Sequence, residues 1–230
     1  MLEEVIWPHV MARSAIQIHQ STMADSSSFA LNQLLSQAIA GNSEALGEIL
    51  IRHRSYLKML ASAQIHQRLQ GKADPSDLVQ ETCLVALKQI GTFRGTSNVE
   101  FAGWLRGILA NLLAKHFRRF LGTQQRDLSI EQSLVESLEY ASGCMQRGLV
   151  AKVDSPSKVL MENETMLELA AALEKLPEDY RMAILLRNIQ GLSFLDVAKA
   201  MNRSVDSVEK LWVRGLAKLK QQMDSNDQNN

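Results

Sequence analysis

The sequence is poor in cysteine and proline. Its 230 residues include only two cysteines and four prolines, and Cys83 and Cys144 stand far apart without paired spacing. Such sparse, unpaired cysteines exclude a disulfide framework and fit a reducing compartment. We therefore expect Cys83 to be a core residue and Cys144 to be a thiol in a loop.

Long hydrophobic runs are absent as well. The most apolar stretch, residues 104–114, contains Arg106 and is too short to span a bilayer. The first ten residues carry two acids and a proline and lack the apolar run of a signal peptide. These features predict a soluble cytoplasmic protein that does not insert into a membrane.

The sequence also lacks the patterns of catalytic and metal sites. Its five histidines do not cluster with cysteines or acids at the spacing of metal ligands. No glycine-rich phosphate loop is followed by Lys and Ser or Thr. We expect neither enzymatic activity nor a metal or other cofactor.

Charge of either sign is not in excess, because 25 basic residues balance 25 acidic ones. A net charge of zero taken alone speaks against nucleic acid as a partner. The distribution differs from the total, since residues 30–126 hold twelve basic and six acidic side chains and residues 180–223 hold eight and three. Between them, residues 127–179 hold four basic and eleven acidic side chains. Two basic blocks that flank an acidic middle indicate two surfaces able to meet nucleic acid.

The composition and the apolar spacing predict an all-α protein. Leu, Ala, Gln, Met, Lys and Glu dominate, and apolar residues recur at helical period in two regions. Asp74 before Pro75 has the pattern of a helix start, and Ser97 with Glu100 has capping-box spacing. We predict two helical domains, 29–122 and 161–223, a weakly ordered extension over 1–28, a linker over 123–160 with one short helix around Leu134–Tyr140, and a polar tail over 224–230.

The end of the second domain has the pattern of a helix-turn-helix. A short helix that starts at Ser193 and ends near Met201 precedes a polar turn, and a longer basic helix begins at Val205. A generic helical hairpin with a solvated charged face is the alternative. The polar residues that would face DNA are Arg203, Ser204, Asp206, Ser207, Glu209, Lys210 and Arg214.

The first block combines cations with polar and aromatic groups around one loop and the following helix. Cations can hold a phosphate backbone, while polar and aromatic groups can contact unstacked bases. Trp104 equally suits a core position, and Arg118 and Arg119 equally suit the negative end of a helix dipole. The set comprises Arg94, Asn98, Trp104, Asn111, Lys115, Arg118 and Arg119.

Three segments in this order resemble the extracytoplasmic-function (ECF) class of bacterial sigma factors. DPSDLVQET (74–82) is similar to the family's polymerase-binding helix, FRG with FAGWLRGILANLLAKHFRR (93–119) to its −10-reading segment, and residues 173–220 to its −35-reading domain. The resemblance implies a transcription initiation factor that binds core RNA polymerase and promoter DNA, as duplex at −35 and as single strand at −10. It also admits an unidentified anti-sigma factor as a partner. The polymerase contacts that it implies are Asp74, Asp77, Leu78, Gln80 and Glu81.

The sequence departs from the family at several positions. Lys115 stands where the family often has an acid, and Glu209 and Leu211 stand where it tends to carry Lys and Arg. We therefore expect a different −35 sequence or a weaker grip on DNA. The extra N-terminal residues have no match, and the acidic linker is longer than usual.

Two other classes of function remain open from the residues alone. A helix-turn-helix regulator would bind duplex DNA without polymerase, and a polymerase-sequestering module would need only the first block. We also expect residues 127–160 to be mobile, and the two basic blocks to close over this acidic segment in the absence of DNA. Such closure would hide DNA-facing surface.

Overall fold

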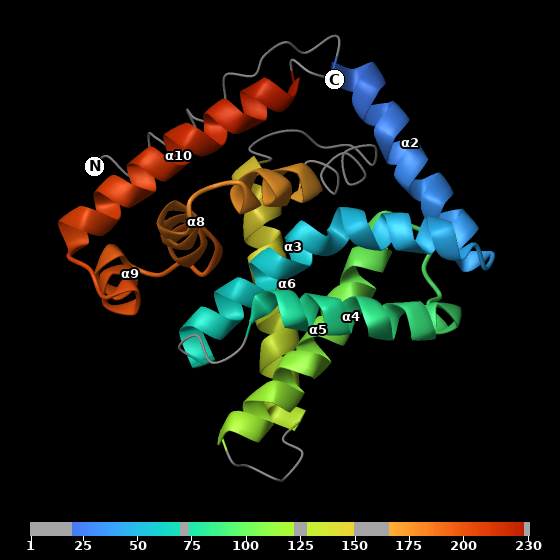
Figure 1. Cartoon of the computed structure of the whole chain (residues 1–230), viewed down its shortest axis with the longest axis horizontal. Coiled ribbons are helices and arrows are strands. Elements are labelled where there is room, and N and C mark those ends of the chain that lie inside the picture. The colour runs from blue at the N-terminus through green and yellow to red at the C-terminus, as the bar shows by residue number, and fades with distance from the viewer. Residues whose placement is uncertain (1–19, 70–73, 122–127, 150–165, 228–230) are drawn as a thin grey trace.

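The computed structural model is built from helices (Figure 1). It describes residues 20–69, 74–121, 128–149 and 166–227, and these ranges contain no strand, so the all-α prediction is confirmed. The elements are α2 (Gln20–Ile39), α3 (Ser43–Leu69), α4 (Pro75–Gln89), the 3₁₀ turn η1 (Ile90–Thr92), α5 (Asn98–Leu121), α6 (Leu128–Leu149), a helical stretch over 166–174, α8 (Glu178–Ile184), the π-helical turn η2 (Leu185–Ile189), α9 (Phe194–Met201) and α10 (Val205–Asp227).

The helix starts lie where the capping residues predict them. The Asp74 carboxylate accepts a hydrogen bond from the Ser76 amide at 2.7 Å, and Pro75 occupies the first turn of α4. Ser97 and Glu100 form the predicted capping box before α5, because each side chain accepts from the other residue's amide, at 3.3 and 3.0 Å. Side chains in these short polar segments therefore satisfy the amides that a helix start leaves unpaired.

The predicted linker over 123–160 is wrong for residues 128–149, which form α6. This helix contains the short one predicted around Leu134–Tyr140 and is longer at both ends. Leu134, Leu138 and Ala141 are buried at helical spacing, and α6 packs along α5. The acidic residues Glu136 and Glu139 are exposed on the outer side of this helix. A helix that places its acids on one face buries enough apolar surface to pack, which an acidic average composition conceals.

Two further predicted boundaries also move. Helix α2 begins at Gln20, inside the extension predicted for 1–28, and α10 continues to Asp227, inside the predicted tail. Residues 1–19, 70–73, 122–127, 150–165 and 228–230 lie outside the described residues. Of residues 127–160, which were predicted to be mobile, 128–149 form α6, and residue 127 and residues 150–160 lie outside the described residues.

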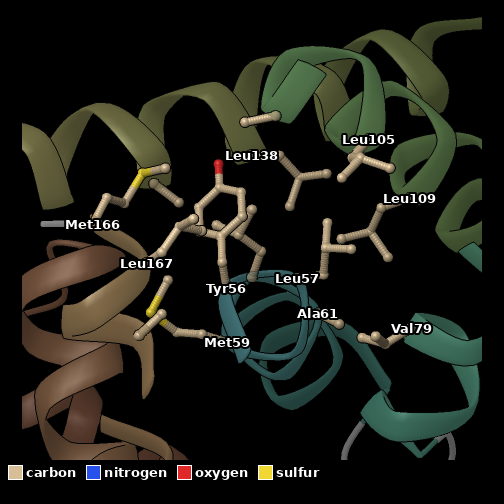
Figure 2. Packing of buried hydrophobic residues seen from close by; sticks show 14 of the residues in the cluster. Tyr56, Leu57, Met59, Ala61, Val79, Leu105, Leu109, Leu138, Met166 and Leu167 are labelled. Atoms are coloured by element: carbon tan, nitrogen blue, oxygen red, sulfur yellow. The ribbon is translucent and has the colours of Figure 1, made fainter. Parts of the chain in front are cut away.

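One continuous core joins the two blocks that the sequence separates. It extends from Leu31 on α2 to Leu219 on α10. Figure 2 shows its middle, where Tyr56 and Met59 on α3 lie beside Met166 and Leu167 from the 166–174 helix. The second block therefore rests on α3 through buried apolar side chains.

Polar contacts reinforce this junction. Glu174 accepts hydrogen bonds from Ser55 Oγ at 2.5 Å and from Lys58 Nζ at 2.7 Å. Gln190 Nε2 donates to the Ala63 carbonyl. Burial opposes ionisation of Glu174, but the hydrogen bonds from Lys58 and Ser55 outweigh it and lower the pKa of this carboxyl.

The expected closure over an acidic segment is therefore wrong in two respects. The junction is an apolar core with one central carboxylate rather than an attraction between exposed charges. It also leaves the outward side chains of α10 uncovered, because Glu209, Lys210 and Arg214 are exposed.

A buried histidine gives a pH-dependent prediction. His53 Nδ1 lies 2.8 Å from the Ile49 carbonyl, its ring packs edge-on against Phe101, and its Nε2 has no partner. Burial lowers the pKa of His53 from 6.5 to about 4, although the hydrogen bond to Ile49 acts in the other direction. As the pH falls below 6.5, the unfolded chain gains a proton that the folded chain cannot accept, so folding stability is lost.

We expect the free energy of unfolding to fall by about 2 kcal/mol between pH 7 and pH 5 from His53 alone. In His53→Leu this component of the pH dependence should disappear, because leucine cannot titrate. Denaturant unfolding of both proteins at the two pH values measures the difference. An equal loss of stability in the variant and the wild type would contradict the assignment.

Candidate nucleic-acid interface

Helix α4 divides the residues expected to contact polymerase into two groups. Asp77 and Gln80 are exposed on its outer face. Leu78, which the resemblance places among the polymerase contacts, is buried and does not lie on that face. Glu81 turns toward α5, where it pairs with Lys115 at 3.6 Å and lies 3.4 Å from His116. Only part of the predicted set therefore points outward.

The outer face of α4 contains two leucines that sequence reasoning missed. Leu84 and Leu87 are 50% and 43% exposed. They follow Asp77 and Gln80 at intervals that keep all four on one side of a helix. The sequence contains this spacing, but only the exposed fractions of the side chains in the structure show that these four residues lie on the solvent side of α4. We define these four residues, Asp77, Gln80, Leu84 and Leu87, as the α4 face.

The loop between α4 and α5 is held in a fixed shape. The Phe93 ring packs with Phe101 and Trp104 at centroid distances of 5.5 Å each. Gly95 lies against Phe93 so closely that a Cβ atom there would come within 2.5 Å of the ring. The Glu100 carboxylate accepts from the Thr96 and Ser97 amides, and these hydrogen bonds lower its pKa. The loop is therefore shaped before any ligand arrives.

The structure gathers most of the predicted −10 residues along one edge. Arg94 is exposed in the loop, where Nη1 donates to the Gly91 carbonyl at 2.8 Å. Trp104 is half-buried, which is compatible both with a core position and with a contact to unstacked bases. Asn111, Lys115 and Arg119 are exposed one turn apart along α5, and Arg118 beside them is half-buried. We call Asn111, Lys115 and Arg119 the α5 edge.

Asn98 does not belong to this surface in the structure. Its side chain is only 3% exposed and donates to Asn32 Oδ1 on α2 at 2.8 Å. Asn98 therefore ties α2 to the start of α5, and its predicted presentation to DNA is wrong for this conformation. A polar residue in a loop sequence gives no sign that another helix will cover it.

The predicted helix-turn-helix is present as α9, a tight turn and α10. Val197 and Ala198 on α9 pack with Val208 on α10, and Leu186 completes this small cluster. Asn202 adopts a left-handed conformation, with φ of 51°, and so ends α9. Two helices in this arrangement can place the second in a major groove.

The predicted −35 residues lie on the open side of the motif, with one half-buried exception, Ser207. Arg203 pairs with Asp179 at 2.7 Å, and Lys210 pairs with Asp206 at 2.7 Å. Ser204 Oγ accepts from the Ser207 amide and so stabilises the start of α10. Glu209 and Arg214 are exposed on α10.

Comparison with known families matches both blocks. Residues 52–120 match the Sigma-70 region 2 model, and residues 166–219 match the Sigma-70, region 4 model. The chain therefore belongs to the sigma-70 family. Within this family it is a sigma factor of the ECF class.

The relatives include two named ECF RNA polymerase sigma factors. BldN of Streptomyces coelicolor is 28% identical over 201 residues, covering 87% of this chain and 69% of that protein. The sigma-E factor of Escherichia coli is 29% identical over 175 residues, covering 76% of this chain and 84% of that protein. Among solved structures, BldN in its complex with RsbN is 22% identical, covers 81% of this chain and 97% of that one, and gives a TM-score of 0.28. No helix within the described residues is long and apolar enough to cross a membrane.

The fixed loop gives a prediction about Gly95. Gly95→Ala should lower the free energy of unfolding by about 1–3 kcal/mol, because the added methyl group must displace Phe93 or Glu100. Gly107→Ala on α5 is a matched control, since a Cβ atom there meets nothing within 4 Å. Alanine should stabilise that helical position by about 0.5–1 kcal/mol. Equal unfolding midpoints for Gly95→Ala and Gly107→Ala would show that the loop accommodates the added methyl group without a loss of stability.

Proposed function

We propose that this protein binds core RNA polymerase through the α4 face and directs it to promoters. The α5 edge and the loop before it then hold the melted −10 strand, while α10 enters the −35 major groove. The observation that carries this proposal is that one chain has two separate surfaces with exposed basic side chains, each in its own sigma-70 region. Lys115 and Arg119 lie on the α5 edge, and Lys210 and Arg214 lie on α10. The names of its relatives as RNA polymerase sigma factors support it.

The protein would act in the cytoplasm without covalent chemistry of its own. Its contribution would be placement, because two weak DNA contacts on one chain raise each other's effective concentration. An anti-sigma factor would be a further partner. A helix-turn-helix regulator acting alone would not account for the region 2 match or for the exposed leucines on α4.

The α4 face has the mixed character expected of a partner-binding surface. Asp77 and Gln80 offer a charge and a hydrogen-bonding amide, and Leu84 and Leu87 offer apolar area. Large apolar side chains grouped on an exposed helix face are typical of protein–protein contacts. Glu81 would act indirectly, since its contacts with Lys115 and His116 set the packing of α4 on α5.

Leu84→Ser combined with Leu87→Ser should weaken binding to core polymerase at least tenfold, because about two leucine side chains of contact area are lost. Both positions are exposed, so the fold should survive. Ile51→Ser is the matched control, because Ile51 is 72% exposed on α3. Co-purification with core polymerase followed by run-off transcription measures the effect. Wild-type recovery of the double variant would exclude the α4 face as the polymerase contact.

Reading both promoter elements requires the two blocks to separate. The −10 and −35 elements are centred about 25 base pairs apart, roughly 85 Å of duplex at 3.4 Å per base pair. A single packed body of this chain length spans only about 45 Å. The junction at Glu174 would therefore open when the protein engages a promoter. Its half-buried ion pair, worth at most about 1 kcal/mol, can exchange for water readily.

A charge swap tests this opening. Lys58→Glu and Glu174→Lys should each place like charges at the junction and shift the free protein toward an extended form. The double variant should restore the pair and the closed form, although the direction of the pair is reversed. Small-angle scattering measures the radius of gyration of the full chain for the wild type, the two single variants and the double variant. Unchanged scattering from both single variants would show that this pair does not hold the blocks together.

A further inference from the structure

Helix α10 presents one continuous exposed stripe. Asp206, Glu209, Lys210, Val213 and Arg214 occupy positions i, i+3, i+4, i+7 and i+8 of the helix, and all five are exposed. The opposite side is buried, because Val208, Trp212, Leu216 and Leu219 lie in the core. The stripe is therefore the side of α10 that can approach a ligand, and we call these five residues the α10 stripe.

The rotation of α10 about its axis is fixed by Trp212. Its Nε1 donates to Asn188 Oδ1 at 2.7 Å, and its ring packs edge-on against Phe194 at a centroid distance of 5.4 Å. Gly215 brings the helix close to Tyr180, since a Cβ atom there would lie 3.2 Å from the Tyr180 Cβ. These contacts hold the α10 stripe outward before any DNA is bound.

Val213 is the apolar member of the stripe. It is 47% exposed, with Glu209 one turn before it and Arg214 beside it. A large apolar side chain on the solvent side of a DNA-reading helix gains little in water, but it fits the methyl group of thymine in a major groove. The sequence pattern alone ranks Val213 as one more apolar helical residue.

The charges of the stripe balance one another. Asp206 and Glu209 offset Lys210 and Arg214, and Lys210 already pairs with Asp206 at 2.7 Å. The carboxylate of Glu209 has no hydrogen-bond or ion-pair partner among the described residues. A balanced surface gains little from the phosphate backbone, so its contribution to binding must come from base edges. A carboxylate in the major groove accepts from the N4 amino group of cytosine.

We propose that Val213 and Glu209 determine the −35 sequence, Val213 by contact with a thymine methyl group and Glu209 by accepting from a cytosine amino group. The two residues are four apart, which is about 6 Å along the helix, or roughly two base-pair steps. The −35 element should therefore contain a C·G pair and a T·A pair about two positions apart. This inference rests on the proposed function of α10.

The experiment uses the full chain with core polymerase and a promoter library randomised at −35. Run-off transcription selects the templates that the wild-type protein prefers. Each selected thymine is then replaced by deoxyuridine, which lacks only the methyl group. For one thymine, wild-type run-off at limiting protein should fall about fourfold, the effect of one lost methyl contact. With Val213→Ala, run-off from the thymine template and from the deoxyuridine template should be equal. With the control Lys218→Ala, run-off from the deoxyuridine template should still be lower.

Glu209→Gln tests the second contact in the same library. Glutamine donates and accepts, and so it favours adenine, which changes the selected base at one position from cytosine to adenine. An unchanged selection, or a wild-type protein indifferent to deoxyuridine at every −35 thymine, would overturn the proposal while leaving the sigma activity intact. Failure of the wild-type protein to support run-off from any template would instead overturn the proposed function, and this inference with it.

Discussion

The burial of α3 on several sides is the constraint on which the rest of the structure depends. Helices α2, α4, α5 and α6 and the η2 turn all pack on it. Tyr56 lies fully buried at its centre, where its hydroxyl accepts from Arg106 at 2.9 Å and donates to Ser142 at 3.1 Å. This hydrogen-bonded chain links α3 to α5 and α6, so a change at Tyr56 would disturb the packing of all three helices. A satisfied polar group also specifies one arrangement among neighbours that apolar packing alone would tolerate.

The contacts around α3 differ in how easily they can be broken. Leu57 and Leu60 are fully buried within the first block, and the loss of either would cost several kcal/mol. Glu174, by contrast, meets Ser55 and Lys58 in a half-buried position, where an ion pair contributes little. Met166 and Leu167 add apolar area to this junction and resist separation. The opening proposed for promoter binding would therefore have to expose these apolar side chains as well as break the ion pair, and contacts with polymerase would have to supply that free energy.

Local rules correctly predicted the starts of α4, α5 and α9 and the helix-turn-helix, because caps and turns depend on residues that are neighbours in the sequence. The incorrect predictions concern which residues other helices bury once the chain has folded. Asn98 has the sequence of a loop residue but lies under α2, and Leu78 was grouped with polar neighbours although it points into the core. The helix predicted around Leu134–Tyr140 was too short, because the acids of α6 lowered the average apolarity, while Leu134 and Leu138 kept the period. Periodicity reports which side of a helix is apolar, but the identity of the packing partner depends on tertiary structure that no local window contains.

Several of the cations proposed to face DNA are paired with carboxylates, in agreement with the net charge of zero. Lys115 pairs with Glu81, Arg203 with Asp179 and Lys210 with Asp206, each between exposed or half-exposed side chains. Such pairs contribute at most about 1 kcal/mol and exchange readily for phosphate. Each exchange nevertheless leaves a carboxylate near the DNA, which lowers affinity for any sequence that offers phosphate alone. If these surfaces bind DNA as proposed, a protein with this charge pattern would depend on base contacts and on the tether between its two blocks. It would then discriminate among promoters at the expense of general affinity for DNA.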